Sequence, residues 1–357
     1  MASGINQKYD KIWSNQGTEW HRVAIPVETI TKELVKPSLF PIIQSPANVI
    51  VDGNNIQLDR YKVLCADYRG LRDDLEENEL ILPLHIPKSG YQVIENEKVW
   101  DMMEQTIKDL GAVITSVGTL EAGKKFFVSV SFEDSEVIIN KDQYKFYLNF
   151  VTSHDGTITL FVYDSAMRIV CMNTLRASMS DRNTGDLQLR VAHKKNADLA
   201  INNLPEVVNS ILIGRTKFKE VMEYLADCKV DQNESIAMTA GYFSADEQNK
   251  LSRQGYNATC EIATLFTRGI ACNGETLYDL ANAATQYWTS GLGTGSKDTN
   301  DFTRTYRSAM GSASDHKCDF VSMLSDETMR KTYTDIGRES WKKFITDEKN
   351  SQKLTLV

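Results

Sequence analysis

Residues 153–195, SHDGTITLFVYDSAMRIVCMNTLRASMSDRNTGDLQLRVAHKK, join a β-hairpin pattern to the most basic part of the chain. The first four residues, SHDG, are a turn sequence that reverses the chain into the alternating strand TITLFVYD. Residues 168–195 contain six Lys or Arg against two acids, a local charge of +4, whereas the whole chain has a formal net charge of −8. This basic island indicates a polyanionic ligand. The alternative is a solvated turn region whose arginines pair with acids elsewhere in the chain.

The size and composition of the chain are those of a globular protein. Its 357 residues, 41% hydrophobic and 25% charged, are enough for two or three packed units. Apolar runs stay below the roughly 20 residues that a membrane helix requires, and the N-terminus lacks the apolar core of a secretory signal. These features predict a cytoplasmic protein with no membrane partner.

Cysteine and histidine residues are scattered along the sequence. The six cysteines form no C-x-x-C pair, and the five histidines show no metal-ligand spacing. We therefore expect reduced thiols, no metal and no cofactor. Residues 291–299, GLGTGSKDT, lack the second glycine and the hydroxyl residue of a phosphate-binding P-loop, and are expected to form a surface loop.

Hydrophobic periodicity divides the chain into four parts. Residues 1–90 are predicted to form an N-terminal arm and a hairpin of half-buried strands that turns at an Asp-Gly pair. Residues 91–195 are predicted to form an α+β core that ends in the basic segment. Residues 196–324 show helical spacing, and residues 325–357 predict a peripheral helix with a frayed tail.

The α+β core can be predicted in more detail. Asn96 is expected to cap a helix over residues 97–110 that has one apolar face, and Gly111 is expected to end this helix. Alternating segments then predict an antiparallel β-meander over residues 112–164. An antiparallel β-meander with a packed helix, followed by a mainly helical C-terminal region, belongs to the α+β class.

Candidate ligand-binding residues lie in two groups. At the tip of a predicted hairpin, Lys124 and Lys125 precede Phe126, a combination that suits phosphate contact and base stacking. Strand alternation also allows Phe126 to be a core residue. The second group surrounds the basic segment, where cations and polar side chains offer phosphate and base contacts. Its members are His154, Arg168, Asn173, Arg176, Arg190, His193, Lys194 and Lys195. A turn role is the alternative for His154, and helix capping is the alternative for Asn173.

The sequence contains no recognisable catalytic set. His154 and Asp155 lie beside Ser153 on one tight turn, where they cannot adopt the geometry of a nucleophile–base–orienter triad. A nuclease or hydrolase would need clustered carboxylates, and near the basic segment the sequence offers only Asp155, Asp164 and Asp181. We therefore expect a protein that is not an enzyme.

Several short motifs occur in order along the chain. They are Gly17-Thr18-x-Trp20-His21, Tyr91-x-Val93 with Asn96, Gly118 and Gly123, Ser153-His154-Asp155-Gly156, Arg168-x-Val170-Cys171-x-Asn173-Thr174-Leu175, Arg190 with His193, and Asn282-Ala283-x-Thr285-x-Tyr287. On these motifs the chain resembles the family of phage- and plasmid-like proteins known as domain of unknown function 932. Glu19 and Arg22 depart from the family pattern, which usually has Pro and Gly there. The resemblance implies a mobile-element origin and a host-cytoplasm setting, and it implies no established activity.

The leading hypothesis is a non-catalytic protein that binds single-stranded nucleic acid, with strand annealing or recombination as its role. The order of strand, helix and meander resembles the core of single-strand annealing proteins, a likeness that implies a homo-oligomer. The alternative is a protein-interaction module that binds a host or defence factor. That alternative predicts a contiguous exposed apolar patch.

Overall fold

The computed structural model describes residues 12–14, 30–132, 136–168, 173–176, 188–194, 204–245, 249–290 and 312–347. Within them the main feature is an eight-stranded antiparallel sheet in the order β1-β5-β6-β8-β9-β10, with β7 also paired to β8 and β11 to β9. The strands are β1 (Ile12–Ser14), β5 (Ala112–Leu120), β6 (Lys125–Phe132), β7 (Glu136–Ile139), β8 (Asp142–Ser153), β9 (Leu160–Arg168), β10 (Asn173–Arg176) and β11 (Gln188–Val191). The predicted α+β class is confirmed.

Two helices cover one face of this sheet, α2 (Asn96–Leu110) and α4 (Leu204–Asp227). Alternate residues of the central strands, such as Val128 and Phe150, join Trp100 of α2 and Val208 of α4 in one buried cluster. Full burial of a Phe or Val side chain stabilises a fold by about 1.5–3 kcal/mol. The chain leaves α2 at Gly111, whose φ of +64° confirms the predicted helix stop.

The turns at one end of the sheet need glycine. Gly123, between β5 and β6, has a φ of +81°, and a Cβ atom there would lie 2.6 Å from the hydroxyl oxygen of Tyr68. Gly156, between β8 and β9, has a φ of +75°. The carboxylate of Asp155 accepts a hydrogen bond from the Thr157 backbone nitrogen at 3.0 Å, which confirms the turn predicted for residues 153–156.

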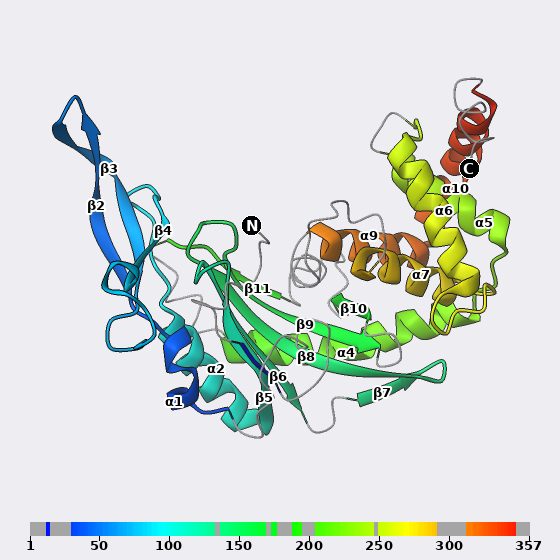
Figure 1. Ribbon diagram of the computed structural model, residues 1–357. Helices are drawn as coiled ribbons and strands as arrows, with labels where there is room; N and C mark the ends of the chain where they lie inside the picture. Colours follow the sequence, from blue (N-terminus) through cyan, green and yellow to red (C-terminus); the bar gives the residue numbers. More distant parts are fainter. Residues whose placement is uncertain are drawn as a thin grey trace.

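A second sheet of three strands, β2 (Ile42–Val51), β3 (Asn54–Asp67) and β4 (Ile81–His85), lies beside the first. Three short helices are next to these strands in the sequence: α1 (Lys32–Val35) and η2 (Lys36–Ser38) before β2, and η3 (Glu77–Glu79) between β3 and β4. Phe40, Leu64 and Leu84 form the core at its base. The predicted hairpin is present, but its outer half is exposed on both faces, because only the base packs on the body (Figure 1).

A group of helices lies at the opposite end of the main sheet from the β2–β3 hairpin (Figure 1). They are α5 (Gln232–Ser244), α6 (Arg253–Arg268), α7 (Leu277–Ser290), α9 (Ser312–Ser325) and α10 (Glu327–Thr346). Their core continues onto β8, where the hydroxyl groups of Tyr144 and Tyr278 are 2.8 Å apart. A mainly helical C-terminal region is therefore confirmed, while the predicted boundaries at residues 90, 195 and 324 stay predictions.

A buried ion pair joins α4 to the sheet. The guanidinium of Arg215 donates two hydrogen bonds to the Asp164 carboxylate of β9, at 2.6 and 2.9 Å, and also lies over the rings of Phe132 and Phe146. The side chain of Asp164 is only 1% exposed. Burial raises the pKa of this carboxyl to about 6, against the opposing effect of the Arg215 charge.

Candidate functional site

The turn end of the main sheet gathers segments that are far apart in the sequence. The register pairs Lys125 with Ser153, and the His154 backbone nitrogen donates to the Lys124 carbonyl at 2.7 Å. From the loop before α2, the hydroxyl group of Tyr91 donates to the Ser153 carbonyl at 3.1 Å. The ring of Tyr91 also stacks on His193 with the centroids 4.7 Å apart. Residues that carried the family resemblance therefore converge at one place.

His154 is a buried link between the β8–β9 turn and helix α2. Its Nε2 atom lies 2.7 Å from Asn96 Oδ1, and Asn96 Nδ2 donates to the Ser38 carbonyl at 2.9 Å. Because the amide oxygen accepts, the proton of the neutral imidazole belongs on Nε2. Burial lowers the pKa of His154 to about 3. Asn96, predicted to be the helix cap, thus serves as a bridge from the first residue of α2.

Replacing Asn96 with alanine is expected to lower the free energy of unfolding by about 2–5 kcal/mol, because the His154 Nε2–H group and the Ser38 carbonyl would both lose a buried partner. Chemical denaturation measures this difference. The matched control is Asn48→Ala on the exposed hairpin, which should cost no more than about 0.5 kcal/mol. Equal stabilities for the two variants would show that the bridge is dispensable.

His193 also belongs to the interior, since its relative exposure is 8%. Its Nδ1 atom lies 3.0 Å from the Gln92 carbonyl, which accepts a hydrogen bond, and its Nε2 atom lies 3.4 Å from Thr152 Oγ1. Burial lowers the pKa of His193, so the ring is neutral at pH 7. Both predicted histidines therefore hold strands and loops together rather than face a ligand.

The predicted binding group at the β5–β6 hairpin needs correction. Phe126 is fully buried in the core beneath α2, so it cannot stack a base. The Lys125 side chain is 6% exposed, and its ammonium pairs with Glu121 at 2.5 Å and with Asp155 at 3.2 Å. A cation held between two carboxylates is already neutralised and is not available to a phosphate. Lys124 alone of this group is partly exposed.

The described pieces of the basic segment include β10 and β11, which lie at one edge of the main sheet. Strands β10 and β11 both pair with β9, β10 with residues 165–168 and β11 with residues 160–163, so they lie on the same side of β9. Register places two arginines on these edge strands and a third at the end of β9 beside them. Arg168 is opposite Asn173, Arg176 is opposite Ser165, and Arg190 is opposite Phe161.

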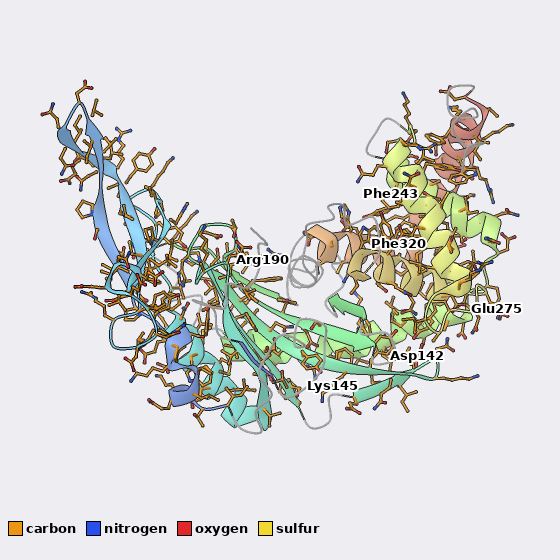
Figure 2. All side chains as sticks on the ribbon, viewed as in Figure 1. Asp142, Lys145, Arg190, Phe243, Glu275 and Phe320 are labelled. Carbon is orange, nitrogen blue, oxygen red and sulfur yellow. The ribbon has the colours of Figure 1, made fainter. Side chains whose placement is uncertain are left out.

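Arg190 is an exposed cation on this edge whose guanidinium lies over an aromatic ring. Its guanidinium carbon lies 4.0 Å from the centroid of the Phe161 ring, and that ring stacks on Tyr163 with centroids 4.6 Å apart. Both aromatic rings are buried, whereas Arg190 is exposed. In Figure 2 Arg190 lies at the hairpin end of the sheet, away from Asp142 at the helical end. This contact between a cation and an aromatic ring fixes the position of the guanidinium over the Phe161 ring.

A row of polar side chains crosses the face of the sheet that carries this stack. Ser129 Oγ donates to Asn149 Oδ1 at 2.7 Å, and Asn149 Nδ2 donates to Ser165 Oγ at 2.9 Å. Asn149 is directly opposite Tyr163 in register. Since the row is buried and its members satisfy one another, it stiffens the strands beneath Arg190.

The remaining predicted residues divide by what the structure describes. Lys194 is exposed just beyond β11, on the same edge as Arg190. For Arg168, Asn173 and Arg176 only the backbone positions in β9 and β10 are described, and Lys195 lies outside the described residues. The sequence interpretation missed Phe161 and Tyr163. Their alternation in the strand next to the basic segment was the signal that could have identified them.

Of the three acids that the sequence offered to a hydrolase, two form ion pairs with basic residues, and the third lies outside the described residues. Asp164 pairs with Arg215 and Asp155 with Lys125, while Asp181 lies outside the described residues. Within the described ranges, no three His, Cys, Asp or Glu side chains gather in a way that suits a metal ion. In the same ranges no helix has the length and apolar character to cross a bilayer.

Fold and site together define a class of protein: an antiparallel sheet with helices on one face and an arginine-bearing edge strand. The family model described as "Domain of unknown function (DUF932)" matches residues 83–310, and the chain belongs to that family. The matched part runs from β4 through the main sheet to helix α7, and the β2–β3 hairpin precedes it. No curated protein and no solved structure matches the chain.

Proposed function

We propose that the protein binds single-stranded nucleic acid along the β10–β11 edge of the main sheet. The observation that supports this best is the exposed residue Arg190, whose guanidinium carbon lies 4.0 Å from the centroid of the Phe161 ring. Unpaired bases stack on arginine planes as well as on aromatic rings, and the same group donates hydrogen bonds to phosphate. Arg190 therefore takes the stacking role that the sequence had suggested for Phe126.

The spacing of the edge residues suits a nucleic-acid strand. Arg176 and Arg190 are opposite Ser165 and Phe161, four residues apart on β9, which corresponds to about 13 Å along the strand. That length matches about four nucleotides at the 3.4 Å rise of a stacked strand. Lys194 extends the same line of positive charge. Although the chain carries a net charge of −8, a basic edge on an acidic body still attracts a polyanion.

The role that we propose for this binding is strand annealing or recombination for a phage or plasmid. It would take place in the cytoplasm of the host cell. Binding that depends on backbone charge and stacking has little sequence preference, as these roles require. Two complementary labelled oligonucleotides therefore provide a second assay. The protein should speed their annealing, and the Arg190 variants described next should speed it less.

Replacing Arg190 with alanine is expected to weaken binding of a labelled oligonucleotide by about 5- to 100-fold, because one stack and one phosphate contact are lost. Arg190→Lys keeps the charge and loses the plane, so it should retain the salt dependence and still bind more weakly. Fluorescence anisotropy titrations at several salt concentrations measure both quantities. The control is Lys331→Ala, which removes an exposed charge from α10. If Arg190→Ala and the control bind alike, the edge is not the binding site.

A further inference from the structure

The outer half of the β2–β3 hairpin projects from the body as a two-stranded ribbon (Figure 1). Strand β4 pairs only with residues 64–67 of β3. Asp52 and Gly53 turn the chain at the tip with φ angles of 51° and 78°, the left-handed geometry of a tight hairpin. We call residues 48–58 the arm. A two-stranded hairpin of this kind is marginally stable in water unless one of its faces is covered.

The arm has one apolar and one polar face. Val49 is directly opposite Ile56, so by strand alternation these two share a face with Val51 and Leu58. The four side chains, which we call the arm face, are 39%, 48%, 46% and 38% exposed respectively. Asn48, Asn55 and Gln57 occupy the other face, with Ile50 as the apolar exception.

Exposed apolar side chains are concentrated in this part of the molecule. The described residues contain fifteen large exposed hydrophobics, of which eight lie between residues 49 and 86. These eight are Val49, Ile50, Val51, Ile56, Leu58, Tyr61, Ile81 and Ile86. Scattered exposed hydrophobics are ordinary, but a contiguous group on a projecting element marks an interaction surface.

The charges of the arm indicate which partner fits the arm face. Residues 46–62 carry two acids, Asp52 and Asp59, and two bases, Arg60 and Lys62, so their net charge is zero. A neutral apolar face offers nothing to a polyanion. The polar tip, with the Asp52 carboxylate beside Asn54, opposes insertion into a lipid bilayer. The complementary surface is therefore another neutral, apolar face of a protein.

We infer that the arm face is an interface between two copies of this chain, in which the arms of two copies pack face to face about a two-fold axis. A two-fold contact brings the same patch together with itself, so it must be self-complementary. The neutral arm meets this requirement, whereas the bodies, in a chain of net charge −8, would repel each other on close approach. Because the arm projects, it lets the copies associate while their bodies stay apart (Figure 1).

The first test compares two isoleucines of the same arm in the full-length chain. Ile56→Ser removes an apolar group from the arm face, and Ile50→Ser makes the same change on the polar face. Sedimentation velocity should show a dimer for the wild type and for Ile50→Ser. For Ile56→Ser the dissociation constant should rise by roughly 10- to 100-fold, since both copies lose a central contact. A monomeric wild type, or equal dimerisation of the two variants, would overturn the inference.

The second test identifies the contact directly. A photo-reactive residue at Val51 in a mixture of isotopically light and heavy chains should give a cross-link between residues 42–67 of one copy and the same residues of another. Cross-links from Val51 to any other part of a second copy would count against the arm–arm contact. So would a monomeric chain that co-sediments with lipid vesicles.

Discussion

Replacing Arg215 with methionine is expected to lower the free energy of unfolding by about 3–5 kcal/mol at pH 8, and by clearly less at pH 6. The substitution removes the one cation that contacts Asp164 in the described residues, while methionine still packs on Phe132 and Phe146. Without its partner, the buried Asp164 carboxyl group must either stay charged in a low-dielectric site or take up a proton. Each of these two states costs free energy at alkaline pH.

The pH dependence has a definite sign. In the wild type the folded pKa of Asp164 is raised from 3.8 to about 6, so the folded state binds the extra proton in this range and stability falls as pH rises through it. Without Arg215 the folded pKa rises further. The loss of stability then continues above pH 6 at about 1.4 kcal/mol per pH unit, whereas the contribution of Asp164 in the wild type no longer changes there.

Chemical denaturation at pH 6, 7 and 8, followed by tryptophan fluorescence, measures this difference. The double variant Asp164→Asn/Arg215→Met carries neither charge. It should recover much of the stability and lose the added pH dependence. A cost for Arg215→Met that is the same at pH 6 and pH 8 would show that Asp164 does not titrate as its burial demands.

The pattern of strands and helices could be predicted because it depends on local periodicity. Gly111 and Gly156 marked chain reversals that the structure confirms with positive φ angles. It was harder to predict which face of each strand is buried. Strand alternation allowed Phe126 to be a core residue and sends Phe127 to the opposite side of the sheet, yet both side chains are buried.

The candidate site was predicted less well, because its members are defined by partners far away in the sequence. Lys125 was expected to be a hairpin cation available to a ligand, but its ammonium lies between the carboxylates of Glu121 and of Asp155, which comes thirty positions later. The Asp164–Arg215 pair spans fifty-one positions and gives no local signal. Of the basic island, the edge strands β10 and β11 remain, and their register with β9 brings Arg176 and Arg190 to the same side of that strand.

The two proposals concern different parts of the chain and can fail separately. The nucleic-acid edge lies on β10 and β11, within the residues that match the DUF932 family model, whereas the arm precedes them. A protein that dimerises through Ile56 but is indifferent to oligonucleotides would refute the binding proposal alone. A monomeric protein that binds oligonucleotides through Arg190 would refute the arm contact alone. The two sets of experiments therefore test the two proposals independently.

Replacing Gly337 with alanine is expected to destabilise the packing of α10 on α5 by about 3 kcal/mol, even though alanine is the better helix former by about 1 kcal/mol. The two helices touch through their backbones at a pair of glycines. A Cβ atom on Gly337 would lie 1.8 Å from the Ala237 carbonyl oxygen, and one on Gly241 would lie 1.8 Å from the Tyr333 carbonyl oxygen. Neither obstacle is a side chain that can rotate away, so the helices themselves must separate.

The separation would have a local signature. Hydrogen exchange should speed up along α10 and the facing part of α5, while the main sheet keeps its protection, because α10 packs on the helices rather than on the strands. Gly90→Ala is the matched control, since a Cβ atom there meets nothing within 4 Å. Unchanged exchange in Gly337→Ala would mean that the helices cross less closely than the glycine pair implies. Faster exchange confined to them would show that a helix predicted to be peripheral is held by backbone contact, which only glycine permits.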